Sequence, residues 1–130
     1  MLKTGLIGHA ETVVCAANTA MAAGSGLAPV FATPCMVALM EEACYTSVIP
    51  FLAEGQGTVG TKLNISHESA TPIDMKVWAD SELKEVDRRR LVFSVTVYDE
   101  CGVIGRGTHE RFIIDNEKFI NRANSKGRAK

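Results

Sequence analysis

The chain changes its hydrophobic periodicity once, and that change limits the folds available to it. From residue 33 to about residue 52 apolar residues recur at helical spacing, whereas most of residues 58–115 alternate between apolar and polar positions. Apolar residues spaced three and four apart predict a helix, and strict alternation predicts strands with one buried face. A single helix followed by long strands and short turns predicts an α+β fold, in which one face of an antiparallel sheet packs on the helix.

The helix signal begins at Thr33-Pro34, because a threonine hydroxyl can accept from free backbone N–H groups and proline is tolerated at the first helical position. Two adjacent glutamates follow, and helical geometry separates them. We expect Glu42 to be solvated and Glu41 to lie at the margin of the packed side. The residues that cluster on that side are Met36, Met40, Ala43, Cys44 and Ser47.

Alternation predicts the strands. Residues 8–18 are predicted as a first strand and residues 20–29 as a loop or mobile flap, with further strands over residues 58–67, 75–85, 91–97 and 102–115. The basic segment 118–130 is predicted to be a short helix that frays into a tail. In the strand over residues 58–67, one face is expected to carry Val59, Thr61, Leu63, Ile65 and His67.

Length and composition indicate one ordinary domain spanning residues 1–130. The chain is 46% apolar and 22% charged with a formal net charge of -1, which excludes the strongly basic footprint of a nucleic-acid-binding protein. No apolar stretch approaches the roughly 20 residues needed to cross a bilayer, so we expect a cytoplasmic protein. The four cysteines form no C-x-x-C pair, so we expect no metal site and expect the cysteines to be buried small apolar residues.

Four segments together resemble a known family. They are FATPCMVALMEEAC at residues 31–44, GTVGTKLNISHESATP at residues 57–72, EVDRRRL at residues 85–91 and GTHER at residues 107–111. Their order and spacing are similar to those of the single-domain hotdog-fold acyl-CoA thioesterases, in particular the fluoroacetyl-CoA thioesterase group. The resemblance implies a curved antiparallel sheet around one long helix, a homodimer or dimer of dimers joined through the sheets, and active sites near the subunit interface. It implies no cofactor, since coenzyme A is part of the substrate.

The resemblance places the catalytic residues of the family at Thr33, Glu41 and His67, and a backbone contact to the thioester at Gly60. Thioester hydrolysis needs a nucleophile, a base and donors for the developing oxyanion. We expect His67 to act as the base, Glu41 to orient it or activate water, and Thr33 to attack or position the substrate. The attacking group is left open between Thr33, Glu41 and water.

Each of these residues also has a structural explanation. Thr33 can be a helix cap, Glu41 can pair with a basic residue, and a lone histidine such as His67 is usually structural. Eight residues of straight helix would separate Thr33 from Glu41 by about 12 Å, which is too far for direct contact. Either the regular helix begins later, with residues 33–36 folded back over it, or substrate or water spans the gap. His109 alternates onto the side of Arg111 and is expected to be structural.

Arg88, Arg89 and Arg90 lie at a predicted hairpin turn and suit the phosphates of coenzyme A, because guanidinium groups bind phosphate oxygens in pairs. A solvated turn is the alternative explanation.

The segment before the helix departs from the family pattern. Fluoroacetyl-specific members carry aromatic lid residues there, whereas this chain has Gly24 and Leu27. We therefore expect hydrolysis of other short- or medium-chain acyl-CoA esters, without a marked preference for the fluorinated ester. The alternatives are a non-catalytic acyl-CoA-binding or sensing module and an enoyl-CoA hydratase, although no aspartate occurs in residues 1–73.

Overall fold

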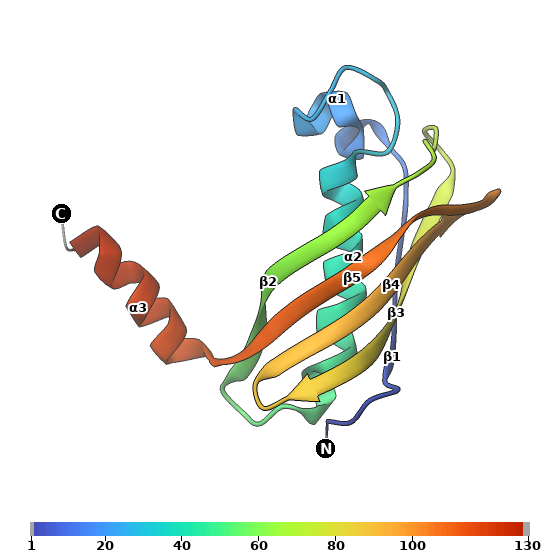
Figure 1. Cartoon of the computed structure of the whole chain (residues 1–130). Helices are drawn as coiled ribbons and strands as arrows, with labels where there is room; N and C mark the ends of the chain where they lie inside the picture. Colours follow the sequence, from blue (N-terminus) through green and yellow to red (C-terminus); the bar gives the residue numbers. More distant parts are fainter. Residues whose placement is uncertain (1, 129–130) are drawn as a thin grey trace.

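The computed structural model describes residues 2–128 and has the predicted α+β hotdog architecture, a curved antiparallel sheet wrapped around one long helix (Figure 1). The helices and short 3-10 turns are η1 (Ala16–Asn18), α1 (Ala20–Ala23), α2 (Thr33–Val48), η2 (Ile49–Phe51) and α3 (Asn116–Arg128). The strands are β1 (Ile7–Val13), β2 (Gln56–His67), β3 (Lys76–Asp87), β4 (Arg90–Asp99) and β5 (Gly102–Asp115).

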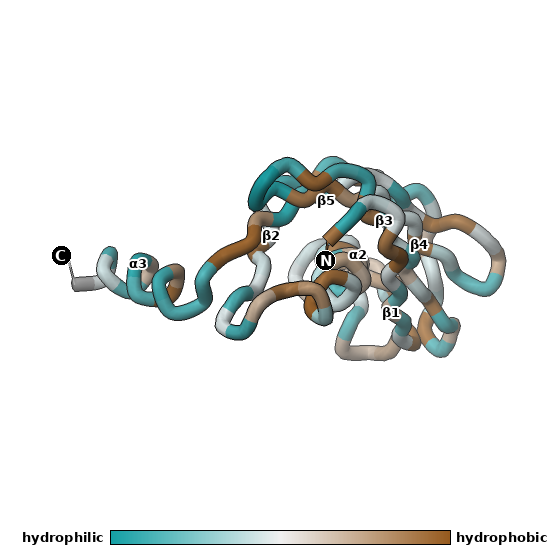
Figure 2. Tube along the Cα trace, turned by 90° about the horizontal axis from the view of Figure 1, so that it is seen from below, coloured by the Kyte–Doolittle hydropathy of each residue, from teal (hydrophilic) through white to brown (hydrophobic). Residues whose placement is uncertain are grey.

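The sheet has the strand order β1-β3-β4-β5-β2, and every neighbouring pair is antiparallel. Seen along the helix, the sheet arches over α2, which occupies its concave side (Figure 2). β1 and β2 are the two edge strands. Within residues 2–128, β2 pairs only with β5, so its outer edge leaves a long row of backbone groups available to another strand.

The predicted apolar side of α2 is the core of the protein. Met36, Met40, Ala43 and Cys44 are all buried, as predicted. Leu39 and Val48 join them on the same side. The facing strands supply the rest of the core, including Val77, Ala79, Leu83, Leu91, Phe93, Val95 and Val97. Burial alternates along most of β3 and all of β4, as expected for strands with one buried face.

Helix α2 lies directly on β1. A side chain at Gly8 would collide with the carbonyl oxygen of Ala43, and its Cβ would lie 2.5 Å from the Ser81 hydroxyl oxygen and 2.9 Å from the Ser47 Cβ. The absence of a side chain at residue 8 thus allows the helix to approach the strand closely.

The start of α2 differs from the prediction. Ala32 is the N-cap and its carbonyl accepts from the Met36 N–H, while Thr33 is already the first helical residue. The Thr33 hydroxyl caps no helical N–H and instead contacts His67. The interpretation of Thr33 as a helix cap is therefore wrong. The helix also ends at Val48 rather than near residue 52, because Pro50 follows and the chain continues as η2.

A β-bulge in β2 corrects the predicted alternation of that strand. Gly60 pairs with Arg111, but Lys62 pairs with Glu110, so Thr61 is an extra residue in the ladder. The inserted residue reverses which side chains face inward. Leu63, Ile65 and His67 face α2 as predicted, but before the bulge the inward positions are Thr58 and Gly60 rather than Val59 and Thr61.

The terminal segments also differ in detail. The predicted strand over residues 8–18 is β1 followed by the turn η1, and the predicted flap over residues 20–29 contains the one-turn helix α1. The predicted C-terminal helix begins earlier, at Asn116, and residues 129–130 of the predicted tail lie outside the described residues. Figure 1 shows α3 projecting away from the sheet. No helix within residues 2–128 has the length and apolar character to cross a membrane.

Candidate active site

Thr33 and His67 form a direct pair at one end of the sheet. Thr33 is the first residue of α2, and His67 is the last residue of β2. The Thr33 Oγ1 lies 2.7 Å from the His67 Nδ1, which is hydrogen-bonding distance. Together with Val30, Glu68, Ser69 and Ala70, the two residues line a surface depression of about 250 Å³.

The electrostatics of His67 suit a proton acceptor. Burial lowers the pKa of the His67 imidazole below its ordinary value, and a backbone hydrogen bond with Ser69 only partly opposes this shift. The ring is therefore neutral at pH 7. Its Nε2 is buried and has no hydrogen-bond partner within residues 2–128. A neutral imidazole with Nδ1 against a hydroxyl can receive the proton of that hydroxyl.

Glu41 lies on α2, two turns from Thr33, and contacts a different set of residues. Its carboxylate accepts a hydrogen bond from the Arg111 guanidinium at 3.3 Å and lies 3.9 Å from the His109 Nε2. The Glu41 residue is intermediate in burial, with a side chain 39% exposed, whereas Glu42 is exposed. The predicted difference between the two neighbouring glutamates is confirmed.

Arg111 and His109 hold Glu41 from the sheet side. The His109 Nδ1 donates to the Lys62 carbonyl oxygen at 2.9 Å, so its Nε2 is the acceptor for the Arg111 N–H at 3.1 Å. This arrangement requires a neutral imidazole. Burial, reinforced by the Arg111 charge, lowers the pKa of His109 and favours the same state. His109 is thus a buried structural histidine, as predicted from its alternation.

Arg111 contacts Glu41 and His109 and was not predicted from the sequence as part of this site. Its side chain is 8% exposed, it donates to the Thr58 hydroxyl at 2.8 Å and to the Thr58 carbonyl at 2.9 Å, and it lies over the Tyr45 ring at 5.6 Å. The signal was present, because alternation in β5 placed Arg111 in the same inward row as His109 and Ile113. An arginine in a buried row needs partners, and a carboxylate on the facing helix is the natural one.

Because Gly60 has no side chain, the surface beside the Glu41 carboxylate stays accessible. A Cβ at this position would lie 2.8 Å from a Glu41 carboxylate oxygen, 3.0 Å from the His109 ring and 3.3 Å from Arg111. Gly60 and Glu41 line a depression of about 260 Å³ with Val37, Thr61, Lys62, Leu63 and His109. A glycine is needed there because any larger residue would fill the space beside the carboxylate.

The structure therefore brings the predicted site residues together in two groups. Thr33 and His67 share one depression, while Glu41 and Gly60 share another. Within residues 2–128, no hydrogen bond or ion pair joins Glu41 to either Thr33 or His67.

The three arginines at the β3–β4 turn have different surroundings. Arg90 is bound by two carboxylates: its guanidinium donates to Glu110 at 2.9 Å and also pairs with Glu85. Arg88 has a positive φ of 58° and occupies the turn itself, and Arg89 extends toward α3. The predicted contact of Arg88, Arg89 and Arg90 with phosphate stays a prediction.

The cysteines show no sign of forming a reactive centre. Burial raises the pKa of the Cys44 thiol to about 12, so it is protonated at neutral pH. Cys15 and Cys101 are exposed, which makes the expectation of buried cysteines wrong for these two. Within residues 2–128, no group of three or more His, Cys, Asp or Glu side chains is arranged to hold a metal ion.

Comparison with known proteins adds independent information. The sequence profile of the fluoroacetyl-CoA-specific thioesterase family matches residues 14–117. The fluoroacetyl-CoA thioesterase of Streptantibioticus cattleyicolor is 46% identical over 90 residues, which cover 69% of this chain and 65% of that enzyme. The match thus spans just under two thirds of the length of that relative.

Solved structures agree with the sequence match. The structure of the fluoroacetyl-CoA thioesterase FlK superposes with a TM-score of 0.92 at 35% identity, covering 97% of this chain and 98% of that one. A phenylalanine-to-alanine variant of FlK in complex with fluoroacetate and CoA superposes with a TM-score of 0.85 at 38% identity, covering 91% and 99%. The chain therefore belongs to the family of fluoroacetyl-CoA-specific thioesterases.

Proposed function

We propose that this protein is an acyl-CoA thioesterase that hydrolyses a short- or medium-chain acyl-CoA to the free acid and CoA, with Thr33, Glu41 and His67 as its catalytic residues. The observation that carries this proposal is the hydrogen bond of 2.7 Å between the Thr33 hydroxyl and the His67 Nδ1. A neutral imidazole beside a hydroxyl at an open depression is the arrangement that activates an oxygen nucleophile. Family membership supports the same reaction class.

When the attacking oxygen is that of Thr33 or of water, His67 would receive its proton and return it to the thiolate of CoA when the C–S bond breaks. If the Glu41 carboxylate attacks, a mixed anhydride forms and the thiolate leaves; the water that hydrolyses the anhydride then supplies the proton through His67. The attacking oxygen belongs to Thr33, to Glu41 or to a water molecule. If Thr33 attacks, an acyl ester forms and water then hydrolyses it. If water attacks, the acid is released directly. The backbone N–H groups at Gly60 or at the start of α2 would stabilise the oxyanion.

We propose that the site is completed in a homodimer, or in a dimer of dimers. Glu41 is about 12 Å along α2 from Thr33 in the same subunit, and the outer edge of β2 is available for pairing. Antiparallel pairing of two β2 edges about a two-fold axis between Leu63 and Asn64 would bring His67 of the partner subunit close to Gly60. Glu41 of one subunit would then face the Thr33–His67 pair of the other.

The segment before α2 bears on substrate choice. Gly24 ends α1 with a positive φ of 75°, and Leu27 is 89% exposed. Neither supplies the aromatic lid expected of a fluoroacetyl-specific member. We therefore propose that acetyl-CoA and longer acyl-CoA esters are hydrolysed at rates comparable to that of fluoroacetyl-CoA. The four free cysteines fit a reducing compartment, and we propose the cytoplasm as the site of action.

The test is release of free thiol from a panel of acyl-CoA esters by the wild-type protein and by Glu41→Ala, His67→Ala and Glu42→Ala. Glu42 is a matched control because it is the neighbouring glutamate on the exposed side of α2. Loss of activity in the first two variants, with retained folding and an active Glu42→Ala, would support the proposal. Tight binding of acyl-CoA without thiol release by the wild type would instead indicate a binding module.

Mixing the two inactive variants tests the shared site. If Glu41 and His67 of one site come from different subunits, a Glu41→Ala/His67→Ala heterodimer contains one intact site. Random exchange of subunits should then restore about a quarter of wild-type activity. No recovery after confirmed exchange would mean that each site is built within one subunit.

A further inference from the structure

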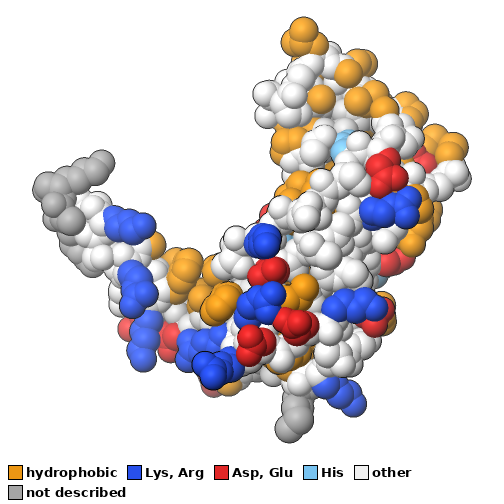
Figure 3. Space-filling model, in the orientation of Figure 1, with side chains coloured by type: hydrophobic (Ala, Val, Ile, Leu, Met, Phe, Trp, Pro, Cys, Tyr) orange, Lys and Arg blue, Asp and Glu red, His pale blue; other side chains and the backbone are white. Residues whose placement is uncertain are grey.

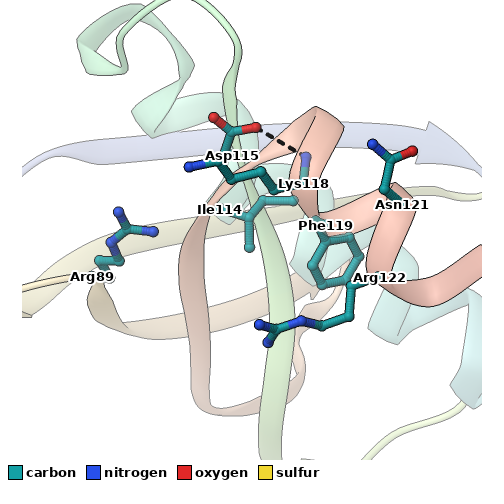
Figure 4. Close-up of a pocket in the computed structure, with 7 residues that line it drawn as sticks. All are labelled: Arg89, Ile114, Asp115, Lys118, Phe119, Asn121 and Arg122. Carbon is teal, nitrogen blue, oxygen red and sulfur yellow. Dashed lines mark hydrogen bonds between the residues drawn. The ribbon is translucent and has the colours of Figure 1, made fainter. Parts of the chain in front are cut away.

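One feature not used by the proposed catalytic residues is a hollow at the base of α3. It lies between α3, the end of β5 and the β3–β4 turn, and its volume is about 490 Å³, within the usual range for small-molecule sites (Figure 4). The close-up shows Arg89 on one side and the α3 side chains Lys118, Phe119 and Arg122 on the other. Figure 3 shows Lys and Arg side chains along α3 and at the adjoining end of the domain.

The hollow has an excess of positive charge. Arg89, Lys118 and Arg122 line it together with a single carboxylate, that of Asp115, which leaves a formal charge of about two positive units. Asp115 also has a structural role, because its Oδ1 accepts from the backbone N–H of Lys118 at 3.1 Å at the start of α3. Within residues 2–128, none of the three cations forms an ion pair.

The absence of ion pairs at these three cations in the described part of the chain contrasts with the pairing of the other arginines in β4 and β5. Arg90 is already paired with Glu85 and Glu110, and Arg106 with Glu68. A phosphate near those residues would have to displace a carboxylate. Arg89, by contrast, is free to form the paired N–H contacts that guanidinium groups make with phosphate oxygens.

The hollow also has an apolar component. Phe119 is 38% exposed and lines the cavity with Ile114 between the cationic side chains. An exposed aromatic ring next to phosphate-binding cations suits a nucleotide, because the ring can stack on a base while the cations bind the phosphates. An inorganic phosphate or an acidic helix could bind the cations but would not stack a base on the Phe119 ring.

We propose that this hollow binds the phosphorylated adenosine end of coenzyme A, with Arg89, Lys118 and Arg122 on the phosphates and Phe119 against the adenine. The proposal rests on the function proposed above and names where the substrate is held away from the reacting carbon. It selects Arg89 from the three turn arginines and adds three residues of α3.

The position along the sheet agrees with such a substrate. Gly60 pairs with Arg111, and Gln56 pairs with Asp115, so the hollow lies four residues along β2 from the Glu41 depression. Four strand residues span about 14 Å. The long, flexible pantetheine arm of CoA can run along the β2–β5 surface from the hollow to Gly60.

The experiment compares Lys118→Ala/Arg122→Ala and Phe119→Ala with the control Lys126→Ala. Lys126 is an exposed cation of the same helix that does not line the hollow. Steady-state kinetics are measured with an acyl-CoA and with the matching acyl-pantetheine, and binding of adenosine 3′,5′-bisphosphate is measured by calorimetry at two salt concentrations.

We expect Lys118→Ala/Arg122→Ala to raise KM for the acyl-CoA about tenfold, with kcat unchanged. Kinetics on acyl-pantetheine and all properties of Lys126→Ala should stay at wild-type values. Binding of the bisphosphate should weaken in both hollow variants and, in the wild type, at higher salt. Equal losses on both substrates, or bisphosphate binding unchanged by the substitutions, would overturn the proposal.

The outcomes also separate this proposal from the proposed function. Hydrolysis of acyl-pantetheine tests the catalytic residues without the hollow, and calorimetry tests the hollow without catalysis. Bisphosphate binding by a protein that hydrolyses no thioester would contradict the function alone.

Discussion

Replacing Arg111 with methionine should destabilise the protein by about 2–3 kcal/mol, mainly through unsatisfied acceptors. Methionine keeps the apolar volume of the arginine stem but removes the donors to Thr58, His109 and Glu41. The His109 Nε2 is then left without its donor, and His109 is only 2% exposed. A buried acceptor without a partner costs roughly 1–3 kcal/mol.

The other lost contacts count for less. Thr58 is half-buried, so water can replace part of what Arg111 donated to it. Glu41 is 39% exposed and stays hydrated, so the loss of its ion pair is screened by solvent. For a chain of this length, the expected total corresponds to a fall in Tm of roughly 6–15 °C.

The assay is urea unfolding followed by circular dichroism at a fixed protein concentration, because association between subunits would make stability depend on concentration. Arg106→Met is the control. Arg106 is 57% exposed and pairs with Glu68 at 2.9 Å on the surface, so its loss should cost less than about 1 kcal/mol. Arg111→Lys should fall between wild type and Arg111→Met, because a lysine cannot reproduce the guanidinium fork. Equal stability of Arg111→Met and Arg106→Met would refute the idea that Arg111 satisfies a buried network.

Two further predictions concern pH and packing. Burial lowers the pKa of both His67 and His109. Below about pH 6.5 the unfolded chain therefore binds more protons at these residues than the folded chain does. The free energy of unfolding should decrease as pH falls from about 6.5 to about 5. The exposed His9 has a raised pKa, so it stabilises the folded protein as pH falls, and the urea titrations are therefore done in a His9→Gln background. A free energy of unfolding that does not decrease between about pH 6.5 and about pH 5 would contradict the effect of burial. Gly8→Val should lower the free energy of unfolding by about 1–3 kcal/mol, because its side chain pushes β1 away from α2. The control is Gly26→Val, because the nearest atom to a Cβ added there is 3.8 Å away. This control should change the free energy of unfolding by less than about 0.5 kcal/mol in the same titration. Equal effects of the two glycine substitutions would contradict the close approach.

The features of the fold that depend on local periodicity were predictable from the sequence. The buried row of β4 and the apolar side of α2 follow from spacing alone, because each element has one face toward a single core. The difference between Glu41 and Glu42 follows from the same geometry. The family resemblance, carried by four short segments, led to the hotdog architecture, which the fold confirms.

Features that depend on tertiary contacts were not predictable in this way. The Thr33 hydroxyl was available to the helix end, but His67 lies within hydrogen-bonding distance of it, and only the folded chain brings residues 33 and 67 together. The network of Arg111 joins α2 to β2 and β5, and no local pattern specifies its partners. The catalytic roles of Thr33, Glu41 and His67 stay predictions until thiol release is measured.

The bulge at Thr61 affects how substitutions along β2 should be interpreted. Before it, the even-numbered positions Thr58 and Gly60 point toward the helix; after it, the odd-numbered positions Leu63, Ile65 and His67 do so. A loss of one residue at this point would look like a trivial gap in a sequence comparison. It would nevertheless exchange interior for exterior along half of the strand, so a relative that lacks the extra residue cannot present both the glycine opening and the histidine to the same side of the sheet.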